Sequence, residues 1–116
     1  MKLPNSERSV VDIEKLVSYC LSVEHPRGRH KARVFAEKLG FTGRDAEKLR
    51  AELLKAAKVE DAVIGEKDSY GQRYVLSCVM YGPKAKTTVR SHWIVRNGED
   101  FPRFVTCYIQ LKGKGK

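Results

Sequence analysis

No stretch of the sequence has the roughly 18 to 20 consecutive apolar residues that a membrane-spanning helix requires. The N-terminus also lacks the apolar segment and the small-residue cleavage site of a signal peptide. Cysteine is scarce, because Cys20, Cys78 and Cys107 are the only three, and their odd number and wide spacing argue against a disulfide framework. We therefore expect a reduced, cytoplasmic protein with no membrane partner.

Recognisable metal and nucleotide motifs are also missing. No two histidines or cysteines have a chelating spacing such as C-x-x-C or H-x-x-x-H, so the sequence predicts no metal site. A glycine-rich nucleotide-binding loop is absent too, since Arg27-Gly28-Arg29 offers a single glycine, which is a weak signal. We expect no cofactor.

Positive charge is what the sequence has in excess. The chain of 116 residues carries 23 Lys and Arg against 14 Asp and Glu, a net charge of +9. Lys112, Lys114 and Lys116 alternate with glycines in what we expect to be a disordered basic tail over residues 112–116, and subtracting their three charges still leaves +6. A charge of this size favours nucleic acid, an acidic protein or an anionic surface as the partner.

Hydrophobic periodicity predicts helices in the first half of the chain. Apolar residues recur at helical spacing over about residues 10–22, over 32–39 and from the middle forties to about 58. Gly40 is placed to end the second helix, and Thr42 with Asp45 resembles a capping box at the start of the third. We assign residues 1–9 to a flexible N-terminus and residues 10–111 to a single domain, with the basic tail after it.

The periodicity then changes from 3.6 to 2, which is typical of strands. The predicted strands cover residues 62–64, 73–81, 86–96 and 103–111. Asn97-Gly98 is a strong turn signal, so the last two strands should form a hairpin. Helices followed by a meander indicate an α+β fold, with N-terminal helices packed on one face of a C-terminal antiparallel sheet of about four strands.

Alternation assigns the two faces of the last two strands. The side expected beneath the helices carries Val89, Ser91, Trp93, Val95, Val105, Cys107, Ile109 and Leu111. The opposite side carries Arg90, His92, Ile94, Arg96, Phe104, Thr106, Tyr108 and Gln110. The exposed face should therefore gather arginine, histidine, threonine and tyrosine side chains, which is unusual for a purely structural surface.

A second polar group lies in the loop His25-Pro26-Arg27-Gly28-Arg29-His30-Lys31. Pro26 and Gly28 predict a tight loop between the first two helices, which presents several hydrogen-bond donors together. We interpret this loop as one half of an anionic-substrate site whose other half lies on the C-terminal strands. Loops held by rigid elements are where binding and catalysis concentrate.

The combined set of side chains suits phosphodiester transfer in RNA, a reaction that needs no metal. Histidine transfers protons near neutral pH, lysine and arginine stabilise the negative charge that grows in the transition state, and hydroxyl groups orient the phosphate. The candidate catalytic residues are His25, His30, Lys31, Arg90, His92, Thr106 and Tyr108, and the candidate RNA-binding residues are Arg27, Arg29, Arg96 and Arg103.

Each candidate also has a purely structural interpretation. His25 before Pro26 can fix a turn by bonding the backbone, and His92 can pair across the sheet. The cations of the loop can be ordinary solvated charges, and Thr106 is a good strand former anywhere. Two other functions stay open: a non-catalytic nucleic-acid-binding domain, and a basic module that docks an acidic protein. The residues do not decide which histidine acts as the base.

Two segments also resemble a known family. His25-Pro26-Arg27-Gly28 through Phe35, and Asp100-Phe101-Pro102-Arg103 through Tyr108, are similar to motifs of an uncharacterised family of small bacterial, toxin-like domains. The order of elements resembles, more distantly, the ribonuclease fold of barnase, EndoU, colicin nucleases and RelE toxins. That resemblance implies a site on the open sheet face, built from His25 or His30 with Lys31, Arg90 or His92, Thr106 and Tyr108. It also implies RNA as substrate and an acidic cognate inhibitor protein as a partner.

Overall fold

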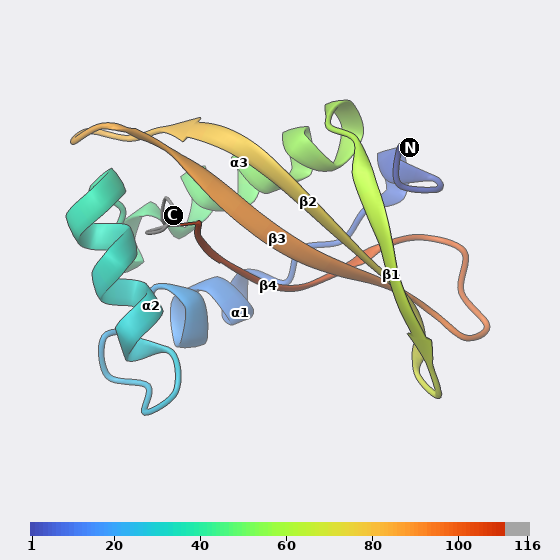
Figure 1. Ribbon diagram of the computed structural model, residues 1–116. Helices are drawn as coiled ribbons and strands as arrows, with labels where there is room; N and C mark the ends of the chain where they lie inside the picture. The colour runs from blue at the N-terminus through green and yellow to red at the C-terminus, as the bar shows by residue number, and fades with distance from the viewer. Residues whose placement is uncertain (111–116) are drawn as a thin grey trace, which may run out of the picture.

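The computed structural model describes residues 1–110, so Leu111 and the predicted basic tail over residues 112–116 lie outside the described residues (Figure 1). Its centre is a four-stranded antiparallel sheet with the strand order β1-β2-β3-β4. Helices from the first half of the chain pack against this sheet, which confirms the predicted α+β fold. No helix among the described residues is long and apolar enough to cross a membrane.

The first helical segment is shorter than the sequence predicted. α1 (Ile13–Lys15) continues into a π-helical turn, η2 (Leu16–Cys20). Asp12 caps it, because its side chain accepts a hydrogen bond from the backbone N–H of Glu14 at 3.0 Å. The prediction that the helix begins near residue 10 was wrong, because Val10 pairs with Arg103 in an isolated parallel bridge.

The other two helices begin and end close to where their capping signals predicted. α2 (Arg29–Val34) continues into the π-helical turn η3 (Phe35–Leu39), and Gly40 ends it with a φ of 89°. The short 3₁₀ turn η4 (Gly43–Asp45) leads into α3 (Ala46–Val59). Thr42 and Asp45 form the capping box there, each side chain bonding the backbone of the other.

Residues 1–9, which the sequence assigned to a flexible segment, contain the 3₁₀ turn η1 (Ser6–Arg8). Leu3 is only 3% exposed and belongs to the hydrophobic core. The carbonyl of Met1 accepts a hydrogen bond from the N–H of Ala62 at 2.5 Å. These contacts join the segment to the packing of the domain, while its mobility stays a prediction.

The four strands are β1 (Ala62–Asp68), β2 (Gly71–Tyr81), β3 (Lys86–Arg96) and β4 (Arg103–Ile109). β1 is longer than predicted, and it turns into β2 at Ser69 and Tyr70. Gly71 has a φ of 151°, and a Cβ added to it would lie 2.2 Å from the carbonyl oxygen of Val95, so only glycine fits where β2 meets β3.

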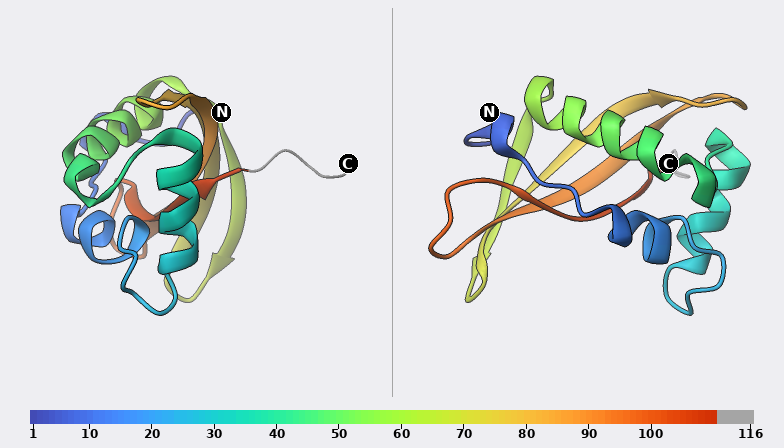
Figure 2. Two further views of the ribbon diagram at one scale, coloured as in Figure 1. Left: turned by 90° about the vertical axis from the view of Figure 1, so that its left-hand side faces the viewer. Right: turned by 180° about the vertical axis from the view of Figure 1, so that it is seen from behind.

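The helices cover one face of the sheet. Figure 1 shows α1 and α3 behind the sheet, and the side view of Figure 2 shows α2 beside the end of β4. Trp93, Leu16 and Phe35 are completely buried between the layers. The indole Nε1–H of Trp93 donates to the hydroxyl of Ser91 at 2.9 Å, which satisfies the two polar groups of the core side of β3.

Two neighbouring residues of β4, Phe104 and Val105, do not lie where the alternation predicted. Trp93 pairs with Phe104 while the preceding His92 pairs with Thr106, so Val105 is an extra residue in β4. This β-bulge shifts the alternation by one position. Phe104 therefore points into the core, where it is 3% exposed and packs edge-on against Trp93, and Val105 is only partly buried. The prediction that Phe104 lies on the exposed face and Val105 in the core was wrong.

Candidate functional site

The four polar candidates of β3 and β4 occupy neighbouring positions in the sheet. Arg90 pairs with Tyr108, and His92 pairs with Thr106. The residues that alternate with them, such as Ser91 and Cys107, are fully buried beneath the helices. The register therefore places all four candidates on the other face, and each is partly exposed.

His92 and Tyr108 form the centre of this group. The imidazole Nε2 lies 2.9 Å from the hydroxyl oxygen of Tyr108, and the ring centroids are 5.5 Å apart. The pKa of His92 is lowered, first by burial and then by the positive charges of Arg90, Lys31 and Arg73. His92 is therefore neutral at neutral pH and available to accept a proton.

Lys31 connects α2 with the strands. Its ammonium nitrogen lies 5.2 Å from the ring centroid of Tyr108 and 5.4 Å from that of Tyr19, within the range of cation–π attraction. No carboxylate among residues 1–110 forms an ion pair with Lys31. Its positive charge is thus held beside the His92–Tyr108 pair by aromatic rings and stays available to an anion.

Arg90 offers a second unpaired cationic group. Its Nε atom is buried and has no hydrogen-bond partner within the described part of the chain. A buried donor without a partner is costly, and a phosphate oxygen is the kind of acceptor that a guanidinium binds most strongly. Arg90 and Lys31 together give the site two cations, one from the sheet and one from α2.

His25 has a structural role that the sequence left open. Its Nδ1 accepts hydrogen bonds from the backbone N–H groups of Arg27 at 3.0 Å and Gly28 at 3.1 Å, and these bonds fix the tight loop. Because Nδ1 is the acceptor, the ring proton lies on Nε2. The ring also packs edge-on against Tyr19, with 4.8 Å between the centroids. Tyr19 thus separates His25 from Lys31.

Tyr19 is a member of this group that the sequence analysis missed. It lies on the last turn before the loop, and its ring contacts both His25 and Lys31. Its position on that turn is the one signal the sequence contains, because the contact itself depends on how α2 folds back.

His30 lies on the first turn of α2, where it lines a pocket between α2 and β4. The pocket has a volume of about 250 Å³, and its walls are His30, Lys31, Val34, Tyr108 and Ile109. It therefore shares two residues, Lys31 and Tyr108, with the group around His92.

Thr106 contacts a pair of buried thiols that sequence reasoning did not connect with the site. Its hydroxyl oxygen lies 3.9 Å from the sulfur of Cys20, and both Cys20 and Cys107 are fully buried, Cys107 on the predicted side of the strand. Hydrogen bonding from Cys107 lowers the pKa of Cys20 to about 7, with Thr106 and the charge of Lys31 acting in the same direction and burial opposing them. Burial raises the pKa of Cys107 well above its usual value. The hydroxyl of Thr106 is thus directed toward η2.

The four candidate RNA-binding arginines are spread over the molecule. Arg27 and Arg29 are exposed beside the loop, and Arg96 is exposed at the far end of β3, roughly 20 Å from Arg90 by strand geometry. Arg103 forms two hydrogen bonds to the carboxylate of Glu99, at 2.8 and 3.0 Å. The carboxylate compensates the charge of Arg103. The guanidinium of Arg103 is therefore engaged by Glu99 and is not part of the group around His92.

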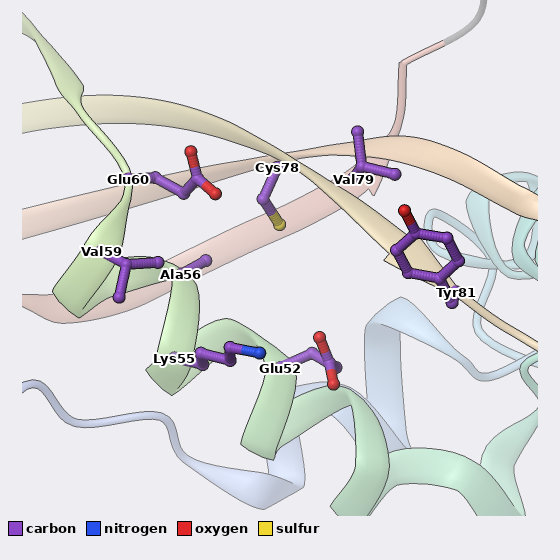
Figure 3. Close-up of a pocket in the computed structure, with 8 residues that line it drawn as sticks. All are labelled: Glu52, Lys55, Ala56, Val59, Glu60, Cys78, Val79 and Tyr81. Carbon is purple, nitrogen blue, oxygen red and sulfur yellow. The ribbon is translucent and has the colours of Figure 1, made fainter.

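A separate groove of about 200 Å³ lies between α3 and β2, on another side of the molecule (Figure 3). Cys78 lies in it near Glu52 and Glu60. Burial first, and then the charges of Glu60 and Glu52, raise the pKa of this thiol to about 11. Cys78 stays protonated at neutral pH, so this groove lacks a nucleophile. No three His, Cys, Asp or Glu side chains among residues 1–110 are grouped so that they could hold a metal ion.

Fold and site together define a small α+β domain whose sheet carries a histidine, a tyrosine and cations on the face away from the core. The chain belongs to the family DUF6883, a domain of unknown function whose model matches residues 2–111. This confirms the resemblance to an uncharacterised family at that level. No curated protein matches the sequence.

The fold is shared with a chain in a solved structure described as a contact-dependent growth inhibition toxin–immunity protein complex from Klebsiella pneumoniae 342. The two chains superpose with a TM-score of 0.67 and are 19% identical, over 87% of this chain and 99% of the other. At this level of identity the similarity shows a common fold.

Proposed function

We propose that this protein is an endoribonuclease of toxin type, in which His92 takes a proton from a ribose 2′-hydroxyl without the help of a metal ion. The observation that carries the proposal is the contact of His92 Nε2 with the Tyr108 hydroxyl at 2.9 Å, beneath the unpaired ammonium of Lys31. This arrangement joins a neutral proton acceptor, a hydroxyl donor and a cation within one site.

The reaction follows from these roles. Neutral His92 accepts the 2′-hydroxyl proton, and the 2′-oxygen attacks the adjacent phosphorus. The bond from phosphorus to the 5′-oxygen breaks, which leaves a 2′,3′-cyclic phosphate and a 5′-hydroxyl. Arg90 and Lys31 stabilise the additional negative charge of the pentacoordinate phosphorus, and the Tyr108 hydroxyl orients a phosphate oxygen.

The departing 5′-oxygen needs a proton, and we assign His30 rather than His25 as its source. The Nδ1 of His25 already accepts two backbone N–H groups, and a proton on that atom would break both hydrogen bonds. His30 is exposed, and it lines the pocket that Tyr108 and Lys31 also line.

The fold similarity supports a toxin-like role. The structure that shares the fold is described as a toxin–immunity protein complex, so one protein of this fold is part of such an assembly. By charge, a cognate inhibitor of this +9 chain would be acidic, and it would neutralise Lys31 and Arg90 by covering the face that carries them.

The test is incubation of the purified protein with labelled tRNA, mRNA and rRNA fragments in the presence of EDTA. We expect cleavage with 2′,3′-cyclic phosphate ends, identified by mass spectrometry, and growth arrest when a bacterium expresses the chain. RNA that binds but stays intact in every class would favour the non-catalytic RNA-binding function. Cleavage that requires a divalent ion would overturn the metal-free chemistry while leaving a nuclease.

A further inference from the structure

The surface that lines the pocket between α2 and β4 is mostly apolar, although two of the five residues that line it are polar. Val34 and Ile109 are apolar and Tyr108 is aromatic, whereas His30 and Lys31 are polar and come from successive positions of α2. Its volume of about 250 Å³ lies just below the range of about 300 to 1,000 Å³ that is usual for drug-sized ligands. The pocket is therefore of a size for one small ring system.

The main chain of β4 directs a donor and an acceptor toward the side on which this pocket lies. Among the described residues β4 is an edge strand, with β3 as its one strand partner. Gln110 N–H donates to the carbonyl of Thr88 in β3 at 2.9 Å, so Gln110 faces β3. Main-chain groups of an antiparallel strand alternate in direction, and the N–H and C=O of Ile109 therefore point away from β3, toward the side where α2 lies.

The same alternation is visible two residues earlier. By the register of β3 and β4, the N–H and C=O of Cys107 also point away from β3. Cys107 and Ile109 thus direct their main-chain groups to the same edge of the sheet. Ile109 is the one of the two that lines the pocket.

We infer that this pocket binds the base of an unpaired nucleotide next to the phosphate that His92 and Lys31 address, an inference that rests on the proposed ribonuclease function. A nucleobase is a flat ring system whose edge carries donors and acceptors. Its faces suit the apolar walls at Val34 and Tyr108, and its edge suits the N–H and C=O of Ile109. Lys31 and Tyr108 belong both to the pocket and to the group around His92. A nucleotide with its base in the pocket therefore has its phosphate beside the ammonium of Lys31.

The inference specifies a substrate class. In an RNA duplex the base edges are engaged in pairing, and the strand edge of a protein cannot reach them. The substrate is therefore RNA with an unpaired or extruded nucleotide beside the cleaved bond, such as a single strand or a loop. A duplex of the same sequence is expected to be cleaved at least tenfold more slowly.

The first experiment measures binding by ¹H–¹⁵N NMR, titrating the full chain with the four nucleoside monophosphates, ribose 5-phosphate and inorganic phosphate. We expect the nucleoside monophosphates to shift the Ile109 amide resonance, and the two probes without a base to leave it in place. Val34→Trp fills the pocket and should abolish that shift. Val59→Trp, at an exposed position at the end of α3, is the matched control and should preserve it.

The second experiment compares cleavage of two single-stranded oligonucleotides, one normal and one with an abasic ribose at the cleaved position, which keeps its 2′-hydroxyl. The wild-type protein should cleave the normal one about tenfold faster or more, in line with the 1–3 kcal/mol found per stacked base. Equal rates together with an unmoved Ile109 resonance would overturn the base pocket while leaving the ribonuclease. Base-dependent shifts without cleavage of any RNA would overturn the ribonuclease and leave a nucleotide-binding pocket.

Discussion

Two regions beside the sheet hold different kinds of titratable group: the group around His92 on β3 and β4, and the groove between α3 and β2. Beside β4, the cations Arg90 and Lys31 help to lower the pKa of His92. Beside β2, the carboxylates of Glu60 and Glu52 help to raise the pKa of Cys78 to about 11. Both groups are kept in their neutral forms, but a neutral histidine is a base whereas a neutral thiol is unreactive. Burial is the largest cause of both pKa shifts, and the nearby charges, positive around His92 and negative around Cys78, add to it.

The largest expected effect comes from removing the titratable group from each of the two regions in turn. We expect His92→Ala to lower the rate of RNA cleavage by about 10²- to 10⁴-fold, the range typical of a lost general base. Cys78→Ala should change the rate by less than about twofold, since that thiol takes no part. Single-turnover kinetics give the rates, and filter binding checks that RNA affinity is retained. Similar losses in both variants would mean that the two regions differ less than their charges indicate.

A second prediction concerns the loop between η2 and α2, which precedes Lys31. A Cβ at Gly28 would lie 2.3 Å from the carbonyl oxygen of Tyr19, which is a backbone atom, so Gly28→Ala must displace the loop or η2. We expect a loss of about 1–3 kcal/mol in the free energy of unfolding, as for other overpacked sites. Gly43→Ala is the matched control, because nothing lies within 4 Å of its added Cβ. Urea denaturation measures both, and equal stabilities would show that the loop is freely adaptable.

RNA binding should distinguish paired from unpaired arginines. Affinity for single-stranded RNA should fall at least about tenfold between 50 and 200 mM salt, because each phosphate contact releases counterions. Arg90→Gln should reduce the slope of log affinity against log salt by about one phosphate contact. Arg103→Gln should change it less, since Glu99 already occupies that guanidinium. A slope that does not change with salt in the wild-type protein would favour the docking of an acidic protein instead.

The smallest expected effect is on the titration of His92 itself. Arg90 is the second cause of its lowered pKa after burial, so Arg90→Gln should raise the pKa part of the way back toward 6.5. NMR titration of the imidazole proton measures the shift. The folded wild-type state binds this proton less readily than the unfolded state, so His92 makes stability decrease as the pH falls below about 6.5. An unchanged His92 titration in Arg90→Gln would show that burial alone sets the pKa.

The sequence predicted the elements and their order because its capping and turn residues act locally. Gly40 needs only its own backbone angle to end a helix, and the Thr42–Asp45 capping box spans four residues. The faces of β3 followed from strict alternation. The face of Phe104 did not, because a β-bulge depends on how two strands pair and leaves no fixed mark in one of them.

The candidate site was predictable in its residue types and less so in its contacts. Arg90, His92 and Tyr108 came together because register alone makes them neighbours. The approach of Lys31 to Tyr108 depends on the packing of α2 beside the end of β4, which a sequence pattern does not contain. The bonds of His25 are local, two and three residues along the chain, so the sequence already offered this interpretation, and the loop geometry decides in its favour.

The extra residue at Val105 divides β4 into two segments, which differ in the alternation of their buried and exposed side chains. On one side of it Phe104 belongs to the packing around Trp93, and on the other Thr106 and Tyr108 belong to the polar face. Core residues lie on both sides of the bulge, because Cys107 and Ile109 are buried as Phe104 is. For protein engineering this means that positions such as Tyr108, on the polar face, can be varied to change the chemistry while the core contacts of β4 on both sides of the bulge are retained.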